Sequence, residues 1–176
     1  MSVAVVLAAI SVNAQKKTDS KEEQKVAFSV GVEGSLPVGT FADAYKFGIG
    51  GSAQVDFAVA PELALTLNAG YISYSGKSTS FTIGGVTTTY KNATAGLVPV
   101  LAGIKYKFGS SMVYGSAQLG AAFSTQSGGG TSFAYAPGIG YNFSKNVDVL
   151  VKYQGFSNNG NSSSAVGLRL AYTFGN

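Results

Sequence analysis

The chain has 176 residues, a formal net charge of +4, and neither cysteine nor histidine. These absences exclude disulfides, thiolate or imidazole metal sites, a cysteine-linked lipid anchor and any mechanism with a Cys or His base. Charged residues are only 11% of the chain, whereas an average soluble protein has roughly 25%. No basic cluster alternates with aromatics, so we expect no nucleic-acid partner, and no motif suggests a cofactor.

The N-terminus predicts export. The apolar run Val3–Ile10 is too short to span a bilayer as a helix, and Val12-Asn13-Ala14 supplies small residues for cleavage before Gln15. We therefore predict a signal peptide over residues 1–14, with a buried N-terminal strand or helix as the alternative. Residues 15–25 have mixed charge and no periodicity, which predicts a flexible periplasmic tail.

The first three predicted strands alternate apolar and small or polar side chains, so each has two different faces. The first runs over 26–36 and is predicted to end at Pro37, because proline cannot donate to a strand ladder. The second covers 47–59, and the short connection 60–62 leads to the third over 63–74. Each strand is about as long as a tilted membrane strand needs to be.

A polar stretch follows over 75–92, and within it β-branched residues flank Gly84-Gly85. A Gly-Gly pair between such arms is typical of a tight hairpin, so we expect this loop to project as its own hairpin. Two further alternating strands are predicted over 98–108 and 112–123, joined by a short turn.

The C-terminal part predicts three more strands, over 133–143, 147–154 and 166–174. Residues 124–132 and 157–163 are expected to be longer polar loops. The total of eight strands, with long and short connections in alternation, predicts an all-β fold, an eight-stranded antiparallel up-and-down transmembrane β-barrel over residues 26–174.

The volume of such a barrel predicts which face points outward. Its interior is just wide enough to be filled by side chains, so four to six large apolar groups per strand would overfill it. The apolar faces must then contact lipid, and a lipocalin-like soluble barrel is the structural alternative. Aromatic residues near the strand ends favour the membrane, because their rings prefer its two interfaces.

Six charged residues fall on the inward faces, and their signs balance. Buried charges persist when they are paired, so we predict an interior network, either structural or pore-lining, in which Arg169 bonds Glu33. Its members are Glu33, Asp56, Lys105, Asp148, Lys152 and Arg169. A structural plug is the main interpretation, and a narrow ion path or a substrate site is the alternative.

The strand pattern, the signal sequence and the aromatic ending resemble the small bacterial outer-membrane β-barrel family, similar to OmpX and the transmembrane domain of OmpA. The resemblance implies a location in the bacterial outer membrane, contact with its lipids, and insertion by the outer-membrane assembly machinery. That machinery recognises a C-terminal strand that ends in an aromatic residue. Tyr172 and Phe174 match this signature, although Gly175-Asn176 follow them.

The main functional hypothesis is a non-enzymatic protein whose barrel anchors extracellular loops for envelope integrity, adhesion or contact with a partner. Any extracellular ligand is expected at loops 37–46, 75–92, 124–132 and 157–163. One alternative is a narrow porin-like pore for ions or small solutes. The other is an outer-membrane lipid-modifying enzyme, for which the chain has no histidine.

Overall fold

The computed structural model describes residues 26–174, so the predicted signal peptide and the tail at 15–25 lie outside the described residues. Within that range the chain forms strands joined by turns, with one short helix. The strands are β1 Val26–Val38, β2 Tyr45–Ala60, β3 Leu63–Gly76, β4 Ser78–Ile83, β5 Val86–Lys91, β6 Ala95–Lys107, β7 Val113–Ser124, β8 Thr131–Asn142, β9 Val147–Asn158 and β10 Asn161–Phe174.

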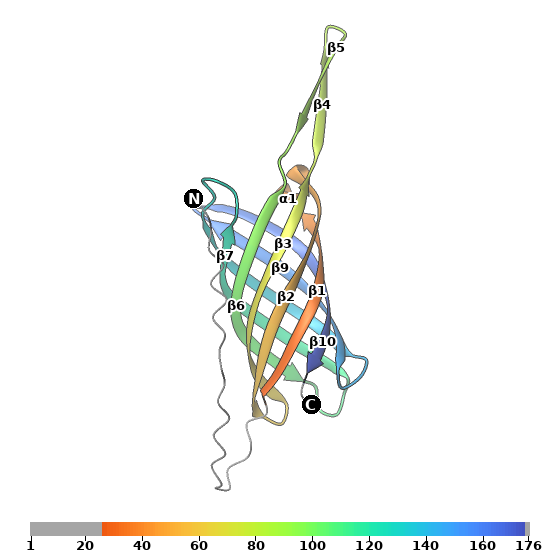
Figure 1. The fold of residues 1–176 in the computed structure, drawn as a ribbon, viewed down its shortest axis with the longest axis vertical. Coiled ribbons are helices and arrows are strands. Elements are labelled where there is room, and N and C mark those ends of the chain that lie inside the picture. The colour runs from red at the N-terminus through yellow and green to blue at the C-terminus, as the bar shows by residue number, and fades with distance from the viewer. Residues whose placement is uncertain (1–25, 175–176) are drawn as a thin grey trace.

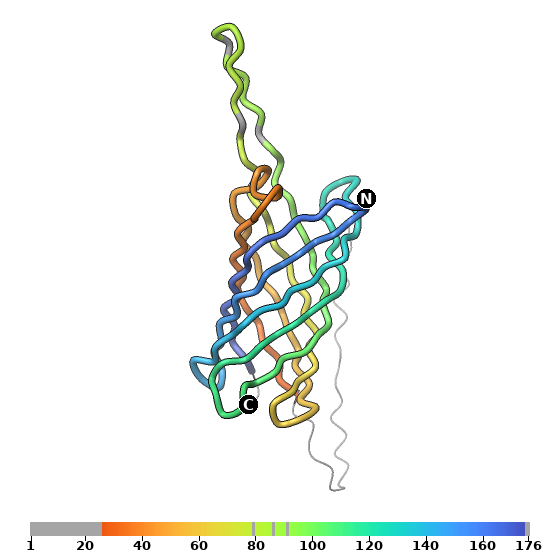
Figure 2. The backbone as a smooth tube through the Cα atoms, turned by 180° about the vertical axis from the view of Figure 1, so that it is seen from behind, coloured from red at the N-terminus to blue at the C-terminus, as the bar shows by residue number. Residues whose placement is uncertain are grey.

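Eight of these strands close into an antiparallel barrel, which confirms the fold predicted from the alternation (Figure 1). The order around the barrel is β1-β10-β9-β8-β7-β6-β3-β2, and β1 closes it by pairing with both β2 and β10. The strands are strongly tilted, and β4 and β5 stand beyond the barrel at one end (Figure 2). We call this the hairpin end, and the opposite end, with the short turns, the turn end.

The two faces of the barrel wall are as different as the alternation predicts. Large apolar side chains cover the outside, where residues such as Val32, Ile49 and Leu119 are at least 60% exposed. At the turn end, β10 finishes in Tyr-x-Phe, and the same motif spans the ends of β6 and β8, where the Phe directly follows the last strand residue. The rings of each pair meet edge to face, and their centroids are 5.6 Å apart at Tyr106–Phe108, 5.2 Å at Tyr141–Phe143 and 4.9 Å at Tyr172–Phe174.

The projecting hairpin forms where the sequence predicts it. β4 and β5 pair only with each other, in register from Ser78–Lys91 to Ile83–Val86. Gly84 and Gly85 both have positive φ, 59° and 83°. A two-residue turn with positive φ at both positions has the twist that hairpin strands need, and glycine adopts it without strain.

Two sequence predictions about loops are wrong. Pro37 does not end the first strand, since β1 continues to Val38 and Pro37 pairs with Ala165 of β10. The loop expected at 157–163 is mostly strand, because β9 and β10 pair as far as Asn158 and Asn161. Only Asn159 and Gly160 turn the chain, both with positive φ. A run of Asn and Ser looks like a loop in sequence, but an adjacent strand can pair with it.

Between β1 and β2 lies the helix α1, Thr40–Ala44, where the sequence predicted a loop. It packs against β1, β2 and β10 at the hairpin end. In the described part of the chain, no helix is long and apolar enough to cross a membrane.

Candidate functional site

The centre of the barrel interior holds a buried cluster of three charges. Glu33 on β1 lies directly opposite Arg169 on β10, with 3.9 Å between Oε1 and Nε. Lys152 reaches Glu33 from β9, across β10, and its Nζ lies 2.8 Å from Oε2. All three side chains are only 2–3% exposed. The sequence placed these residues on inward faces, and the barrel closure brings them together.

The guanidinium of Arg169 is held by hydroxyl groups as well as by charge. Nε donates a hydrogen bond of 2.9 Å to Ser52 on β2, and a terminal nitrogen donates one of 3.0 Å to Ser29 on β1. The contact between Lys152 and Glu33 Oε2 is an ion pair whose angles do not meet those of a hydrogen bond. Arg169 is therefore the residue that ties three neighbouring strands together.

The other three predicted charges lie nearer the turn end and form two smaller groups. Lys105 Nζ is 3.4 Å from Asp56 Oδ2, and it also lies 4.2 Å from the ring centroid of Tyr114, a cation–π distance. The Tyr114 hydroxyl donates a hydrogen bond to Asp148. Each of the six charged side chains thus has a partner of opposite charge or a hydrogen-bond donor.

Tyr114 reaches Asp148 because β8 has glycine where the ring passes. Tyr114 on β7 pairs with Gly140, and Asp148 lies on β9, one strand further. A Cβ at Gly140 would be 2.1 Å from the ring carbon Cζ, which no structure tolerates. Gly140 therefore leaves the space through which the Tyr114 side chain passes.

An amide network that the sequence did not predict lies next to Asp56 inside the barrel. Gln118 donates to Gln54 at 3.2 Å and to Thr66 at 3.0 Å, and Asn68 donates to Gln54 at 3.3 Å. Gln54 in turn donates to Asp56 at 2.7 Å, which joins this network to the charges. Gln54 and Asn68 are cross-strand partners in the β2–β3 hairpin, whereas Gln118 reaches them from β7, two strands beyond β3.

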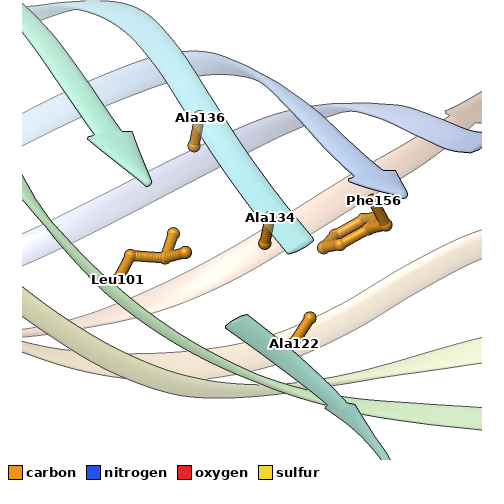
Figure 3. Close-up of a cluster of buried hydrophobic side chains, with 5 residues drawn as sticks. All are labelled: Leu101, Ala122, Ala134, Ala136 and Phe156. Carbon is orange, nitrogen blue, oxygen red and sulfur yellow. The ribbon is translucent and has the colours of Figure 1, made fainter. Parts of the chain in front are cut away.

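An apolar cluster fills part of the interior toward the hairpin end. Five buried side chains from β6, β7, β8 and β9 point toward one another there (Figure 3), namely Leu101, Ala122, Ala134, Ala136 and Phe156. Each bulky member faces alanines on the other strands. Large and small side chains together therefore fill the lumen without overfilling it.

Aromatic rings cover this apolar half at its mouth. Phe41 of α1 packs edge to face on Tyr74 with 4.9 Å between ring centroids, and Tyr45 lies 5.0 Å from Phe41. The Tyr74 hydroxyl shares a 2.8 Å hydrogen bond with Ser35, which donates to Gln154 at 3.0 Å. Helix α1 is therefore anchored to the inner wall at the hairpin end by ring contacts.

The projecting hairpin presents large apolar side chains away from the barrel. Phe81, Ile83 and Tyr90 are 61%, 81% and 73% exposed. Two hydroxyl pairs connect its strands, Ser80 with Thr89 and Thr82 with Thr87, each at 2.9 Å. A lone two-stranded hairpin is only marginally stable in water, and these cross-strand bonds stabilise it.

The base of the hairpin is tied to the barrel by backbone hydrogen bonds. The Lys77 N–H donates to the Ala44 carbonyl at 2.8 Å, and the Asn92 N–H donates to the Lys77 carbonyl at 2.9 Å. Exposed Lys46 and half-buried Lys77 lie here, and Asp43 is the one acidic residue at this end of the described chain. The rim around the hairpin is therefore basic.

Among the described residues, no group of His, Cys, Asp and Glu side chains could hold a metal ion. The buried serines Ser29, Ser35 and Ser52 hydrogen-bond to Arg169, Tyr74 and Gln154. Neither a guanidinium nor an amide can take a proton from a hydroxyl at neutral pH.

Solved structures with this fold are membrane barrels. Ail of Yersinia pestis, in complex with the heparin analogue sucrose octasulfate, is 16% identical over 87% of this chain and 100% of its own, with a TM-score of 0.56. The N-terminal barrel of Pseudomonas aeruginosa OprF is 15% identical over 84% of this chain and 97% of its own, with a TM-score of 0.55. At these identities the likeness shows the fold alone.

A designed transmembrane β-barrel is 16% identical over 88% of this chain and 99% of its own, with a TM-score of 0.51. No curated protein matches the chain. The family model described as "Outer membrane protein beta-barrel domain" matches residues 2–174. The chain therefore belongs to the outer membrane protein beta-barrel family, and its membrane is the outer membrane of a bacterium.

Proposed function

We propose that this protein is a non-enzymatic outer-membrane anchor whose β4–β5 hairpin binds an acidic or sulfated polysaccharide outside the cell. In barrels of this class the short turns face the periplasm and the longer loops face outward, so the hairpin end is the extracellular end. The observation that carries the proposal is the hairpin itself, which stands clear of the barrel and belongs to no other sheet (Figure 1).

The exposed side chains of the hairpin support a polysaccharide partner. Phe81 and Tyr90 offer aromatic faces on which sugar rings can pack, and neither is covered by the barrel. Exposed aromatic groups of this kind commonly mark interaction sites. The basic rim at Lys46 and Lys77 adds attraction for an acidic or sulfated chain that extends toward the membrane. The neighbouring fold Ail, crystallised with a heparin analogue, makes heparin a reasonable first probe.

The filling of the lumen supports an anchor in preference to the alternative of a pore. A pore needs a continuous polar path, whereas buried Leu101 and Phe156 occupy the extracellular half of this lumen. Phe41 and Tyr45 pack against buried Ile72, Tyr74 and Ala95 at the same end. We propose that the refolded protein gives no single-channel steps in a planar bilayer, and steady conductance would favour the pore instead.

The proposal is tested by removing the hairpin while keeping the barrel. Residues 78–91 are replaced by Asn-Gly, so that the backbone bond between Lys77 and Asn92 remains as the base of a short turn. Whole cells that display each variant are then applied to heparin-coated beads. We expect cells with the full chain to bind and cells with the shortened chain to lose binding.

Heat-modifiable migration on a denaturing gel verifies that the shortened barrel is folded. Two double variants separate the contributions of the aromatic rings and of the positive charges to heparin binding. The first combines Phe81→Ser and Tyr90→Ser, and the second combines Lys46→Gln and Lys77→Gln. Both are expected to weaken binding, and only the second should reduce its dependence on salt. Equal binding by the full and shortened chains would exclude the hairpin as the binding arm.

A further inference from the structure

The free edges of the β4–β5 hairpin have no role in the proposed function. Along two antiparallel strands, pairs that exchange two backbone hydrogen bonds alternate with pairs whose backbone groups point away from each other. At the hairpin base, Lys77 and Asn92 are joined by a backbone hydrogen bond of 2.9 Å. Counting from this pair along the register, Ser80 and Thr82 of β4 direct their N–H and C=O groups away from β5. These groups are unpaired, because β4 belongs to no other sheet.

The β4 edge lacks the features by which proteins usually protect a strand edge. Protected edges carry a lysine, a proline, a bulge or an inward-pointing charge, because unpaired N–H and C=O groups recruit other strands. β4 reads Ser-Thr-Ser-Phe-Thr-Ile, with no charge and no proline, and its register with β5 is unbroken. β5 has the same kind of composition but ends at Lys91. Of the two edges, the one on β4 is therefore better suited to accept another strand.

A second β4 is the strand that fits this edge. When two β4 strands pair antiparallel about Phe81, Ser80 of each copy lies opposite Thr82 of the other, and both residues direct their backbone groups across the boundary. The two Phe81 residues then lie directly opposite each other, and aromatic pairs across strands stabilise a sheet. A neutral strand also has no like charges that repel its own copy. The β4 edge is thus complementary to itself, as a two-fold interface requires.

The direction of the hairpin decides where the second copy must lie. β4 runs away from the barrel toward the turn at Gly84-Gly85 (Figure 1). An antiparallel β4 runs the opposite way, so its own barrel lies beyond the tip of the first hairpin, in a facing membrane. Pairing of β4 with β4 therefore joins two cells.

Pairing within one membrane meets a spatial conflict. There all hairpins point the same way, so β4 would pair antiparallel with β5 of a neighbour, and the two hairpins would be two strand spacings apart, about 10 Å. Strands spaced about 4.8 Å apart and tilted by about 40° enclose, for a barrel of eight, a backbone cylinder about 16 Å across. Barrels side by side would therefore collide, whereas barrels in facing membranes do not meet.

We propose that the β4 edge pairs with the β4 edge of a second copy on a facing cell, so that the two hairpins form one four-stranded antiparallel sheet between the membranes. A lone two-stranded hairpin is only marginally stable, and additional strands stabilise it. The pairing depends on the backbone of β4, whereas polysaccharide binding depends on side chains of the hairpin and its rim. Either proposal can therefore fail without the other.

The test uses two variants that lose the same hydroxyl contact. Ser80→Pro and Thr89→Pro each remove the 2.9 Å bond between these two hydroxyls, and each places proline where the N–H points outward, on opposite edges of the hairpin. Ser80→Ala removes the same bond but keeps the N–H. For each variant, two populations of displaying cells are labelled with different dyes and mixed, and clusters that contain both dyes are counted by flow cytometry.

We expect mixed clusters for the unmodified chain, Ser80→Ala and Thr89→Pro, and about tenfold fewer for Ser80→Pro, because each pairing then loses two backbone hydrogen bonds. Cells without the protein should not join the clusters. If they do join, the hairpin binds another surface ligand and self-pairing is wrong. Equal counts for the two proline variants, or no clusters with the unmodified chain, would overturn pairing through the β4 edge.

A disulfide experiment tests the register. The chain has no cysteine, so a single introduced thiol has no partner within its own chain. In the proposed sheet the two Phe81 Cα atoms are about 4.5 Å apart, within disulfide range, whereas the two Thr88 Cα atoms are three strand spacings apart, about 14 Å. Mild oxidation of mixed cells should therefore give a dimer on a non-reducing gel for Phe81→Cys and none for Thr88→Cys. A dimer from Thr88→Cys alone would assign the contact to β5, and no dimer from either would overturn the pairing about Phe81.

Discussion

The two halves of the lumen are filled by different kinds of contact. The periplasmic half holds ion pairs and hydrogen bonds, with Glu33 between Lys152 and Arg169 at its upper edge. The extracellular half holds an apolar cluster around Leu101 and Phe156. Side chains fill the lumen in both halves. The stability of the first half depends on complete pairing of its polar groups, and the stability of the second depends on close packing of its apolar side chains. Substitutions should therefore have different consequences in each half.

The largest effect is expected in the charged half, for Glu33→Ala. This change leaves two buried cations without their carboxylate, and breaking a buried pair in this way costs about 4 kcal/mol. The free energy of unfolding would be measured in lipid vesicles by urea titration, followed by circular dichroism because the chain has no tryptophan.

A triple variant with Met at positions 33, 152 and 169 is the matched control. Replacing a whole buried ion cluster by apolar residues of similar volume is often close to neutral, so the triple variant should be more stable than Glu33→Ala. If the triple variant is less stable than Glu33→Ala, the three charges stabilise the barrel by more than offsetting the cost of their own burial.

In the apolar half, Leu101→Ala is expected to cost about 3 kcal/mol, because it removes buried methyl groups and leaves a cavity. Leu101 is 3% exposed. Leu168→Ala on the lipid-facing wall, where Leu168 is 50% exposed, should cost less, since lipid chains can move into the space. The same urea titration applies. Equal losses at the two positions would mean that the upper lumen is not closely packed.

The smallest effect inside the lumen is expected for Ser35→Ala, which removes a polar contact from the half that holds the apolar cluster. The loss of its bonds to Tyr74 and Gln154 should cost about 1–2 kcal/mol. Ser80→Ala removes an exposed hydroxyl pair on the hairpin and should change the stability by less than about 0.5 kcal/mol. A cost at Ser35 as small as at Ser80 would mean that water replaces the lost partner within the lumen.

Much of the fold could be predicted from alternation alone. The wall strands, the outward apolar face and the Gly84-Gly85 hairpin follow from short-range patterns, because the two faces of a strand and the φ angles of a turn are local properties. The same alternation placed all six charged residues inward. It could not predict that Pro37 continues β1 or that β9 and β10 meet at Asn159, since both depend on a neighbouring strand.

The partners inside the barrel were decided only by closure. Alternation states that Gln54, Asn68 and Gln118 point inward, but the contact between Gln118 on β7 and Gln54 on β2 depends on the stagger of the tilted strands. The same stagger places Tyr114 over Gly140. Local sequence therefore determined the face on which each side chain lies, and the tertiary structure determined its contacts, because those contacts join strands that are distant along the chain.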